Sequence, residues 1–245
     1  MADVTGHSRL ADGDTEYTPS GVGDITTESV TRITITQPDI DFEREKSARE
    51  DIKEGIPIRQ FSDAYLETLA VYRKIADCLL SCDTLLFHGS VIAVDGEGYL
   101  FTAKSGTGKS THTRLWREYF GERAVMVNDD KPLLHITDSG VTAYGTPWDG
   151  KHRLSTNTAV PLKGICILTR DLTNHIEPAE PHVVYPLIVQ QTNRSLSADR
   201  MKQILFLIDR MLNVVPVYRL GCNMDIEAVR VAYEGMNRRK KQEES

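Results

Sequence analysis

The chain has 245 residues, of which 40% are hydrophobic and 26% are charged, and its formal net charge is −6. That length suffices for one large α/β domain, or for one domain with a small annex. The acidic balance gives no indication of a nucleic-acid or membrane partner. No run approaches the roughly 18 apolar residues of a membrane span, and the N-terminus lacks an apolar signal core, so we expect a cytoplasmic protein.

The cysteines give no indication of a metal site. They are Cys78, Cys82, Cys166 and Cys222. The spacing of Cys78 and Cys82 places both on one face of a helix. No second pair of cysteines or histidines stands at zinc-like spacing, so we interpret all four as buried thiols in a reducing compartment. The one basic run, residues 238–241, is expected to be a solvated helix end within a charged tail at residues 238–245.

The N-terminal part separates into two regions. Residues 1–24 are polar and without periodicity, and we predict a flexible segment. Residues 25–84 are expected to supply a strand and a helix that pack on the core, as a small N-terminal β/helical extension. The alternating run Val30–Thr36 predicts the strand. The charged residues 40–56 predict a loop or short helix. An amphipathic helix is expected from Asp63, capped by that residue or by the serine before it.

Residues 85–237 are predicted to form the core. Short strands are expected at 84–87, 90–94 and 99–103, with a glycine turn joining the last two and a helix following directly. Further strands are predicted at 124–127, 133–136, 141–144, 164–169 and 214–220, and helices at 198–212 and 225–236. Several neighbouring strands are joined by turns too short for parallel crossovers. We therefore predict an α/β fold with a mixed sheet flanked by helices.

The most specific motif is a glycine loop (residues 103–110) between a predicted strand and a predicted helix. Its candidate nucleotide-binding residues are Ser105, Gly106, Thr107, Gly108, Lys109, Ser110 and Thr111. The pattern is G-x-x-x-x-G-K-[ST], with Ala103 in place of its first glycine. Glycines let backbone N–H groups turn toward phosphate oxygens, and a helix N-terminus favours anions. Lys109 would neutralise the β- and γ-phosphates, and Ser110 would bind Mg²⁺. The alternative is a Gly/Ser-rich turn with a surface lysine.

Two acidic residues follow the next apolar strand, about 20 residues past the loop. That strand ends at Asn128, Asp129 and Asp130. Phosphoryl transfer needs a carboxylate that holds the metal and a group that takes the acceptor's proton. Neighbouring side chains in an extended backbone point opposite ways, so one aspartate can face the metal and the other the acceptor. The alternative is an acidic turn.

A third polar region is expected to bind the acceptor. The loop 145–153 contains Lys151, His152 and Arg153, which suit a phosphate or an anionic acceptor. A packed loop with a solvated basic rim is the alternative. A second polar stretch, residues 190–194, is expected at a helix end. Its Arg194 is a candidate clamp for a carboxylate or phosphate, with a surface salt bridge as the alternative.

These motifs together resemble the superfamily of HPr kinase/phosphorylase and phosphoenolpyruvate carboxykinase. The resemblance rests on His88 just before a hairpin that leads into the glycine loop, and on the strand that ends in Asp129 and Asp130. It is specific over roughly residues 85–135 and loose over 136–236. A closer resemblance, to the compact kinase-like members of this superfamily, rests on the strings FHGS, SGTGKSTHTRLW, VNDDKP, YGTPWDGKH and VPLKG. Some of these members accompany lasso-peptide gene sets and phosphorylate a peptide serine, and a related branch phosphorylates free serine.

The resemblance implies a role for each matching residue. It implies Asp129 as acid/base, Asp130 as a Mg²⁺ ligand, and His88 as a metal ligand or a neighbour of the catalytic aspartate. It also implies ATP as donor and Mg²⁺ as cofactor, with Mn²⁺ as an alternative. The arginine-bearing substrate segment of the carboxykinases and the signature segment of the HPr kinases have no counterpart here. Neither the carboxykinase reaction nor HPr as acceptor is therefore expected.

The combined expectation is an ATP-dependent kinase that phosphorylates a hydroxyl of a small anionic metabolite or of a serine-bearing peptide. Asp129, His88 and Lys109 are its candidate catalytic residues. Two alternatives stay open: a nucleotide-sensing module without transfer, and a phosphorylase or hydrolase that uses the same site. The sequence leaves the oligomeric state open, a homo-oligomer included.

Overall fold

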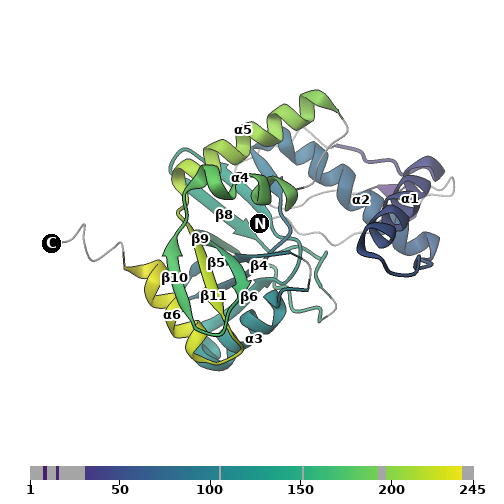
Figure 1. Cartoon of the computed structure of the whole chain (residues 1–245). Helices are drawn as coiled ribbons and strands as arrows, with labels where there is room; N and C mark the ends of the chain where they lie inside the picture. Colours follow the sequence, from purple (N-terminus) through teal and green to yellow (C-terminus); the bar gives the residue numbers. More distant parts are fainter. Residues whose placement is uncertain are drawn as a thin grey trace. The chain divides into compact units, whose positions relative to one another are not determined.

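The computed structural model describes residues 31–104, 106–150, 152–192 and 197–238, and the backbone of two short strands before them. The chain divides into two compact units, Met1–Cys78 and Leu79–Ser245 (Figure 1). Within the described part, none of the helices combines the length and the apolar character needed to cross a membrane.

The first unit is mainly helical. The strands β1 (Ser8–Arg9) and β2 (Thr15–Glu16) pair antiparallel, and most of residues 1–24 lies outside the described residues. The helices are α1 (Gln37–Glu54) and α2 (Asp63–Leu79). Thus α2 confirms the helix predicted from Asp63, whereas α1 is longer than the loop or short helix expected at 40–56. The Arg73 guanidinium joins the two helices by an ion pair with Glu43, at 2.6 Å between Nε and Oε1.

The strand predicted at Val30–Thr36 is wrong for the described residues 31–36, which have no regular secondary structure. Ile33 and Ile35 are buried, as the alternating pattern requires. The carbonyl of Thr34, however, accepts a hydrogen bond from Lys74 Nζ at 2.7 Å and not from a neighbouring strand. The alternation therefore reports burial of one side of the segment and not membership of a sheet.

The second unit is a mixed α/β structure, as predicted. Its strands are β3 (Thr84–Leu86), β4 (Ser90–Val94), β5 (Glu97–Thr102), β6 (Ala124–Asn128), β7 (Leu133–Thr137), β8 (Gly140–Tyr144), β9 (Ala159–Arg170), β10 (His175–Pro178) and β11 (Val217–Cys222). Its helices are α3 (Lys109–Phe120), α4 (Pro181–Gln190), α5 (Ala198–Val214) and α6 (Glu227–Asn237), with the short 3₁₀ turns η1 (Leu80–Cys82) and η2 (Gly121–Arg123).

These strands form one nine-stranded sheet in the order β3-β7-β8-β9-β5-β4-β6, and β11 pairs with both β9 and β10. The pairs β5–β9 and β9–β11 are parallel, and the remaining pairs are antiparallel. The long strand β9 joins the antiparallel strands β3, β7 and β8 to the strands on its other side, because its first residues pair with β8 and its last residues pair with β11. Strand β10 was not predicted, and of helix α4 only its end near residue 190 was expected.

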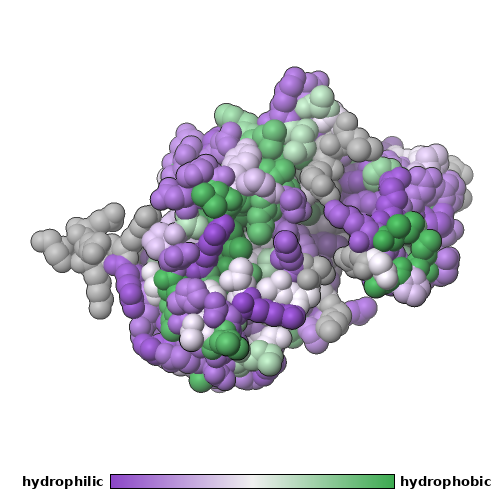
Figure 2. All heavy atoms as spheres, in the orientation of Figure 1, coloured by the Kyte–Doolittle hydropathy of each residue, from purple (hydrophilic) through white to green (hydrophobic). Residues whose placement is uncertain are grey.

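Helices cover both faces of the sheet (Figure 1). Successive side chains of a strand point to opposite faces, so Val91 belongs to the hydrophobic cluster under α4 and α5, and Ile92 to the cluster under α3 and α6. All five residues of β4 are buried, as expected for a strand covered on both faces. On the molecular face drawn in Figure 2, hydrophilic residues predominate and hydrophobic ones form separate patches.

The cysteines correct one expectation. All four are free thiols, but only Cys166 is buried, and Cys78 and Cys82 are exposed. Helix α2 ends before Cys82, which lies in η1, so the two residues do not share a helix. The interpretation of all four as buried thiols is therefore wrong, because it followed from the lack of zinc-like spacing and not from which side of each element faces the core.

Candidate active site

Three strand ends bring the predicted site residues to one edge of the sheet. Strand β4 lies between β5 and β6 and runs antiparallel to both. The carboxyl ends of β5 and β6 and the amino end of β4 therefore meet at the same edge. The glycine loop follows β5, Asp129 and Asp130 follow β6, and His88 stands before β4. Sheet topology thus gathers residues from three separate parts of the chain.

The glycine loop has the backbone conformation that its sequence predicts. Gly106 and Gly108 have φ values of 75° and 122°, and a Cβ on either would meet nothing within 4 Å. The left-handed backbone, and not crowding by the protein, therefore favours glycine here. Thr107 closes the turn, because its N–H and its Oγ1 donate to Lys104 O at 3.2 and 2.8 Å. Ser105 lies outside the described residues.

Lys109 is the first residue of α3, and its side chain folds back toward the start of the loop. Its Nζ lies 3.4 Å from Ala103 O. Burial lowers the pKa of Lys109, and the negative charge of Asp130 acts in the opposite direction. Ser110 is exposed and Thr111 is half-buried, so the Ser110 hydroxyl is accessible from solvent. A cation and a hydroxyl thus stand together at the N-terminus of the helix.

Asp129 is almost buried, with 6% of its surface exposed. Its Oδ1 accepts the backbone N–H of Gly150 at 2.6 Å, and its carbonyl accepts the Ser90 hydroxyl at 2.9 Å. Burial raises the pKa of Asp129, the Gly150 N–H lowers it, and the charges of Asp149 and Asp130 raise it again. The net direction is upward. A raised pKa makes the ionised carboxylate a stronger proton acceptor.

Asp130 has different partners and the opposite pKa shift. Its Oδ1 lies 3.3 Å from His88 Nε2, and its Oδ2 lies 3.8 Å from Lys131 Nζ. Burial alone raises the pKa of Asp130, but the hydrogen bond from His88 and the charges of Lys131 and Lys109 outweigh it, so the pKa is lowered. Two neighbouring carboxylates with opposite shifts suit two different roles.

Both backbone polar groups of His88 are hydrogen-bonded. Its N–H donates to Gln191 O at 2.6 Å, and its carbonyl accepts the Thr102 hydroxyl at 3.1 Å. The resemblance places this histidine either on the metal or beside the catalytic aspartate. Its ring contacts Asp130, the candidate metal ligand, and not Asp129.

Asn128 fixes the turn that carries both aspartates, a role that its sequence position did not reveal. It is fully buried. Its Nδ2 donates to Thr146 O and Oγ1 at 3.2 and 3.0 Å. Its Oδ1 accepts the N–H groups of Asp130 and Lys131 at 2.9 and 2.5 Å. All these groups are thereby satisfied away from water.

The loop 145–153 packs against the end of β6. A Cβ on Gly145 would lie 1.9 Å from Thr156 O and 2.6 Å from Val127 O, so no side chain fits at this position. A Cβ on Gly150 would lie 2.9 Å from Asp129 Oδ2. The glycines that punctuate this loop therefore let it approach the catalytic strand closely.

The cationic end of the same loop is exposed. His152 and Arg153 are both solvent-exposed, and the Arg153 N–H donates to Gly150 O at 3.0 Å. Arg153 has a φ of 49°, in the left-handed region that non-glycine residues rarely adopt. No ion pair joins either side chain to another described residue. Lys151 lies outside the described residues.

The predicted second polar stretch also begins beside this site. The carbonyl of Gln191, at the end of α4, accepts the His88 N–H, and Thr192 forms an isolated bridge with Phe87. The Gln191 carboxamide is buried, and its Oε1 has no partner among the described residues. Arg194 itself lies outside the described residues.

Arg170 is a further residue at this edge that the sequence did not indicate. It ends β9, the parallel neighbour of β5. Its guanidinium donates to two carbonyls of the glycine loop, from Nη2 to Gly106 O at 2.5 Å and from Nε to Thr107 O at 3.3 Å. Only the parallel pairing of β5 with β9 brings it there, and local sequence patterns do not predict such pairing.

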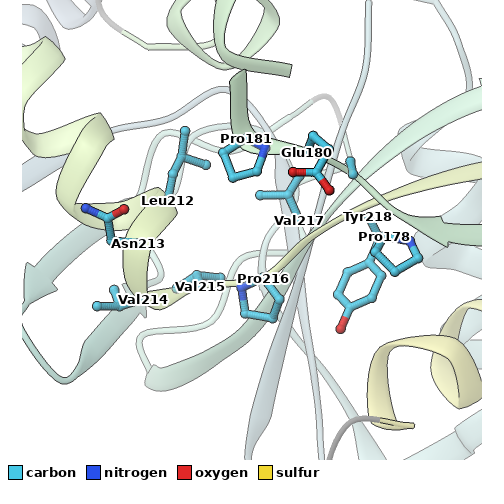
Figure 3. A pocket seen from close by; sticks show the side chains of 11 residues that line it. Pro178, Glu180, Pro181, Leu212, Asn213, Val214, Val215, Pro216, Val217 and Tyr218 are labelled. Carbon is cyan, nitrogen blue, oxygen red and sulfur yellow. The ribbon is translucent and has the colours of Figure 1, made fainter. Parts of the chain in front are cut away.

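A separate pocket lies at the opposite edge of the sheet (Figure 3). Its lining includes Pro178, Pro181, Leu212, Pro216 and Tyr218. Because β11 is parallel to β9 and β5, its amino end is remote from the glycine loop. This pocket is therefore not part of the candidate active site.

The oxygen ligands available to a metal ion fit Mg²⁺. No group of three or more His, Cys, Asp or Glu side chains that could hold a metal occurs in the described part of the chain. Mg²⁺ is usually held by one or two carboxylates together with substrate phosphates and water. Asp130, ionised because its pKa is lowered, and the exposed Ser110 hydroxyl are suitable ligands of that kind.

Comparison with known proteins gives no sequence relative. No protein-family model matches the chain, and no curated protein matches it. Among solved structures, the chain is similar to the Hpr(Ser) kinase/phosphatase from Coxiella burnetii, with 12% identity and a TM-score of 0.37 over 64% of this chain and 98% of that one. A similarity with so low a TM-score does not support a conclusion about function, which therefore depends on the residues of the site.

Proposed function

We propose that this chain is an ATP-dependent kinase that phosphorylates a hydroxyl group. The observation that supports it most strongly is the meeting of three features at one sheet edge. These are the glycine loop with Lys109, a carboxylate with a raised pKa and a carboxylate with a lowered pKa. Donor binding, proton transfer and metal binding each need one of them.

The glycine loop and the N-terminus of α3 would hold the phosphates of ATP. The unpaired N–H groups and the positive end of the helix dipole favour an anion there. Lys109, already partly desolvated, would neutralise the β- and γ-phosphates. Asp130 and Ser110 would hold Mg²⁺, which when bound supplies positive charge to the phosphate oxygens.

Asp129 would act as the base. As the acceptor oxygen forms its bond to the γ-phosphorus, its hydroxyl proton passes to the Asp129 carboxylate. The bond between the γ-phosphorus and the bridging β–γ oxygen breaks, and ADP leaves. The near-complete burial of Asp129 keeps bulk water from competing for this proton, and its raised pKa favours the transfer.

The acceptor is proposed to carry an anionic group beside its hydroxyl. Arg153 and His152 follow Gly150 in the chain, and Gly150 contacts Asp129, the proposed base, directly. The Arg153 N–H also donates back to Gly150. Lys151 and Arg194, outside the described residues, are proposed to contribute as well. Guanidinium groups bind carboxylates and phosphates well. Free serine, or a serine of an anionic peptide, is an acceptor of this class.

The proposal is tested by following the label of γ-³²P ATP. The protein is incubated with Mg²⁺ and one acceptor at a time: free serine, a peptide with a C-terminal serine, and glycerol. We expect label in one of the serine compounds. Asp129→Asn should reduce transfer about 100-fold or more, whereas Asp199→Asn, an exposed change on α5, should not. Labelled free phosphate alone would indicate a hydrolase, and bound ATP without turnover a sensing module; either result contradicts the kinase.

A further inference from the structure

The second inference concerns the nucleoside of the donor, and it rests on the proposed nucleotide binding. The γ-phosphate must face Asp129 and Asp130, because transfer takes place there. In the sheet, β6 carries these residues on one side of β5, whereas β9 and β11 lie on the other side. A nucleotide held by the glycine loop must therefore extend its nucleoside toward β9 and β11.

The end of β9 is already in contact with the glycine loop. Arg170 donates to the carbonyls of Gly106 and Thr107. The C=O and N–H of a trans peptide point in opposite directions. Because Arg170 holds the Thr107 carbonyl, the Gly108 N–H points away from Arg170, which leaves it available to a phosphate oxygen. Arg170 thus connects the glycine loop to the segment that follows β9.

Two loops follow the ends of β9 and β11 and are tied together by hydrogen bonds. They are residues 171–174 and 223–226. Asn174 Nδ2 donates to Asn223 Oδ1, and the Asn223 N–H donates back to Asn174 Oδ1, both at 3.0 Å. Asn223 Nδ2 also donates to Leu172 O at 3.2 Å. These reciprocal bonds hold the two loops side by side as one surface.

This surface carries large apolar side chains that are open to water. Leu172 is 92% exposed, Met224 is 77% exposed and Ile226 is 44% exposed. Single exposed apolar residues are ordinary, but three on two joined loops near the glycine loop mark a candidate ligand-binding patch. We refer to Leu172, Met224 and Ile226 as the apolar platform.

We propose that the apolar platform binds the heteroaromatic base of the nucleotide whose phosphates lie in the glycine loop. A flat base has an apolar face that packs on leucine, isoleucine and the polarizable methionine. The platform is small, is continuous with the glycine loop through Arg170, and lies on the side away from the two aspartates. A base attached to bound phosphates meets all three conditions.

The test compares two ligands that share the phosphates and differ in the nucleoside. Binding of Mg-ATP and of Mg-tripolyphosphate is measured by calorimetry for the wild type and for the double variant Leu172→Ser/Met224→Ser. Serine removes apolar surface without adding charge. We expect about a tenfold weaker ATP affinity in the variant and an unchanged affinity for tripolyphosphate. Leu172→Ser alone should show a smaller change in the same direction.

Two control variants separate this proposal from the previous one. Phe206→Ser, at a 58% exposed apolar position on α5, should bind both ligands like the wild type. Arg170→Ala should weaken both ligands, because it acts on the glycine loop. Equal wild-type affinity for ATP and tripolyphosphate, or ATP binding unaffected by the double variant, would overturn the platform and leave the kinase standing. Wild-type protein that binds neither ligand would overturn both.

Discussion

The backbone N–H of Gly150 donates to Asp129 Oδ1 over 2.6 Å, so the loop 145–153 is attached to the proposed catalytic base itself. Gly150 does not have a positive φ, unlike Gly106 and Gly108. Its backbone conformation does not require glycine, and a Cβ is opposed only by the Asp129 carboxylate, 2.9 Å away. The requirement for glycine is therefore imposed by one side chain.

This relationship predicts a coupling between the two positions. Gly150→Ala should lower the free energy of unfolding by about 1–3 kcal/mol, because the loop must shift and the hydrogen bond is strained. In an Asp129→Ala background the same change should cost much less. Urea unfolding of the four proteins measures the coupling. Equal costs in both backgrounds would show that the contact does not restrict Gly150.

The opposite pKa shifts predict opposite effects of neutralising each aspartate. The raised pKa of Asp129 contributes stability below its ordinary value of 3.8, and this stability is lost as the pH rises through the folded pKa. Ionised Asp129 is therefore unfavourable at pH 7, and Asp129→Asn should stabilise the metal-free fold. Asp130 has a lowered pKa, which stabilises the fold above 3.8 and is lost as the pH falls through the folded pKa. Asp130→Asn should therefore destabilise it at pH 7.

Urea unfolding in EDTA at pH 7 and again near pH 3 tests this pair of effects. Both differences from the wild type should shrink at the lower pH, because Asp129 is then protonated in the folded protein and the Asp130 carboxyl is increasingly protonated in the unfolded chain. Two variants that shift stability in the same direction at pH 7 would contradict the assignment of opposite pKa shifts.

Asn128 predicts a stability effect without a change of charge. Asn128→Ala leaves the N–H groups of Asp130 and Lys131 without their buried acceptor and should cost about 2–3 kcal/mol. Thr146→Val removes only one hydroxyl from the same network and should cost about 1 kcal/mol. Denaturant unfolding gives both values. A cost for Asn128→Ala no larger than that for Thr146→Val would show that the amide does not hold the aspartate turn.

Arg153 predicts a selective effect on the acceptor. Arg153→Ala should raise the acceptor KM by about tenfold or more, as expected for the loss of a charge-assisted hydrogen bond. The KM for ATP should change less than about twofold, because the proposed nucleotide site uses other residues. Arg219→Ala, at an exposed position on β11, is the matched control. An equal rise in both KM values would place Arg153 outside the acceptor site.

Local patterns predicted the elements around the glycine loop well. Strand β4 has the predicted bounds, and the turn at Asp95 and Gly96 separates it from β5 as expected. Alternation, positive-φ glycines and the helix start after the loop are all encoded within a few residues. The same holds for Asp129 and Asp130, whose position at a strand end follows from the apolar run before them.

Features that depend on tertiary contacts were missed or wrong. Strand β10 is only four residues long and pairs solely with the distant β11. Of helix α4 only the end near residue 190 was expected, because Pro186 inside it argues against a helix in the sequence. Helix α1 is strongly charged, and its length depends partly on ion pairs such as Glu43 with Arg73 on α2.

The sequence indicated candidate site residues but not the contacts among them. The pairing of His88 with Asp130, the attachment of Gly150 to Asp129 and the position of Arg170 on the glycine loop all join parts of the chain that are far apart in sequence. Such contacts follow from strand order, which a single sequence does not specify. The sequence therefore indicated candidate chemical groups, and the strand order of the sheet determines which of these groups contact one another.

Nucleotide binding by the glycine loop is the claim on which the others depend, and thermal unfolding with Mg-ATP tests it most directly. At about 100 times its dissociation constant, ATP should add roughly 2.7 kcal/mol to the stability of the wild type. Lys109→Ala should lose most of this gain, whereas Lys202→Ala, an exposed lysine on α5, should keep it. A wild type whose unfolding temperature does not change with millimolar Mg²⁺ and ATP, ADP or GTP would contradict the account.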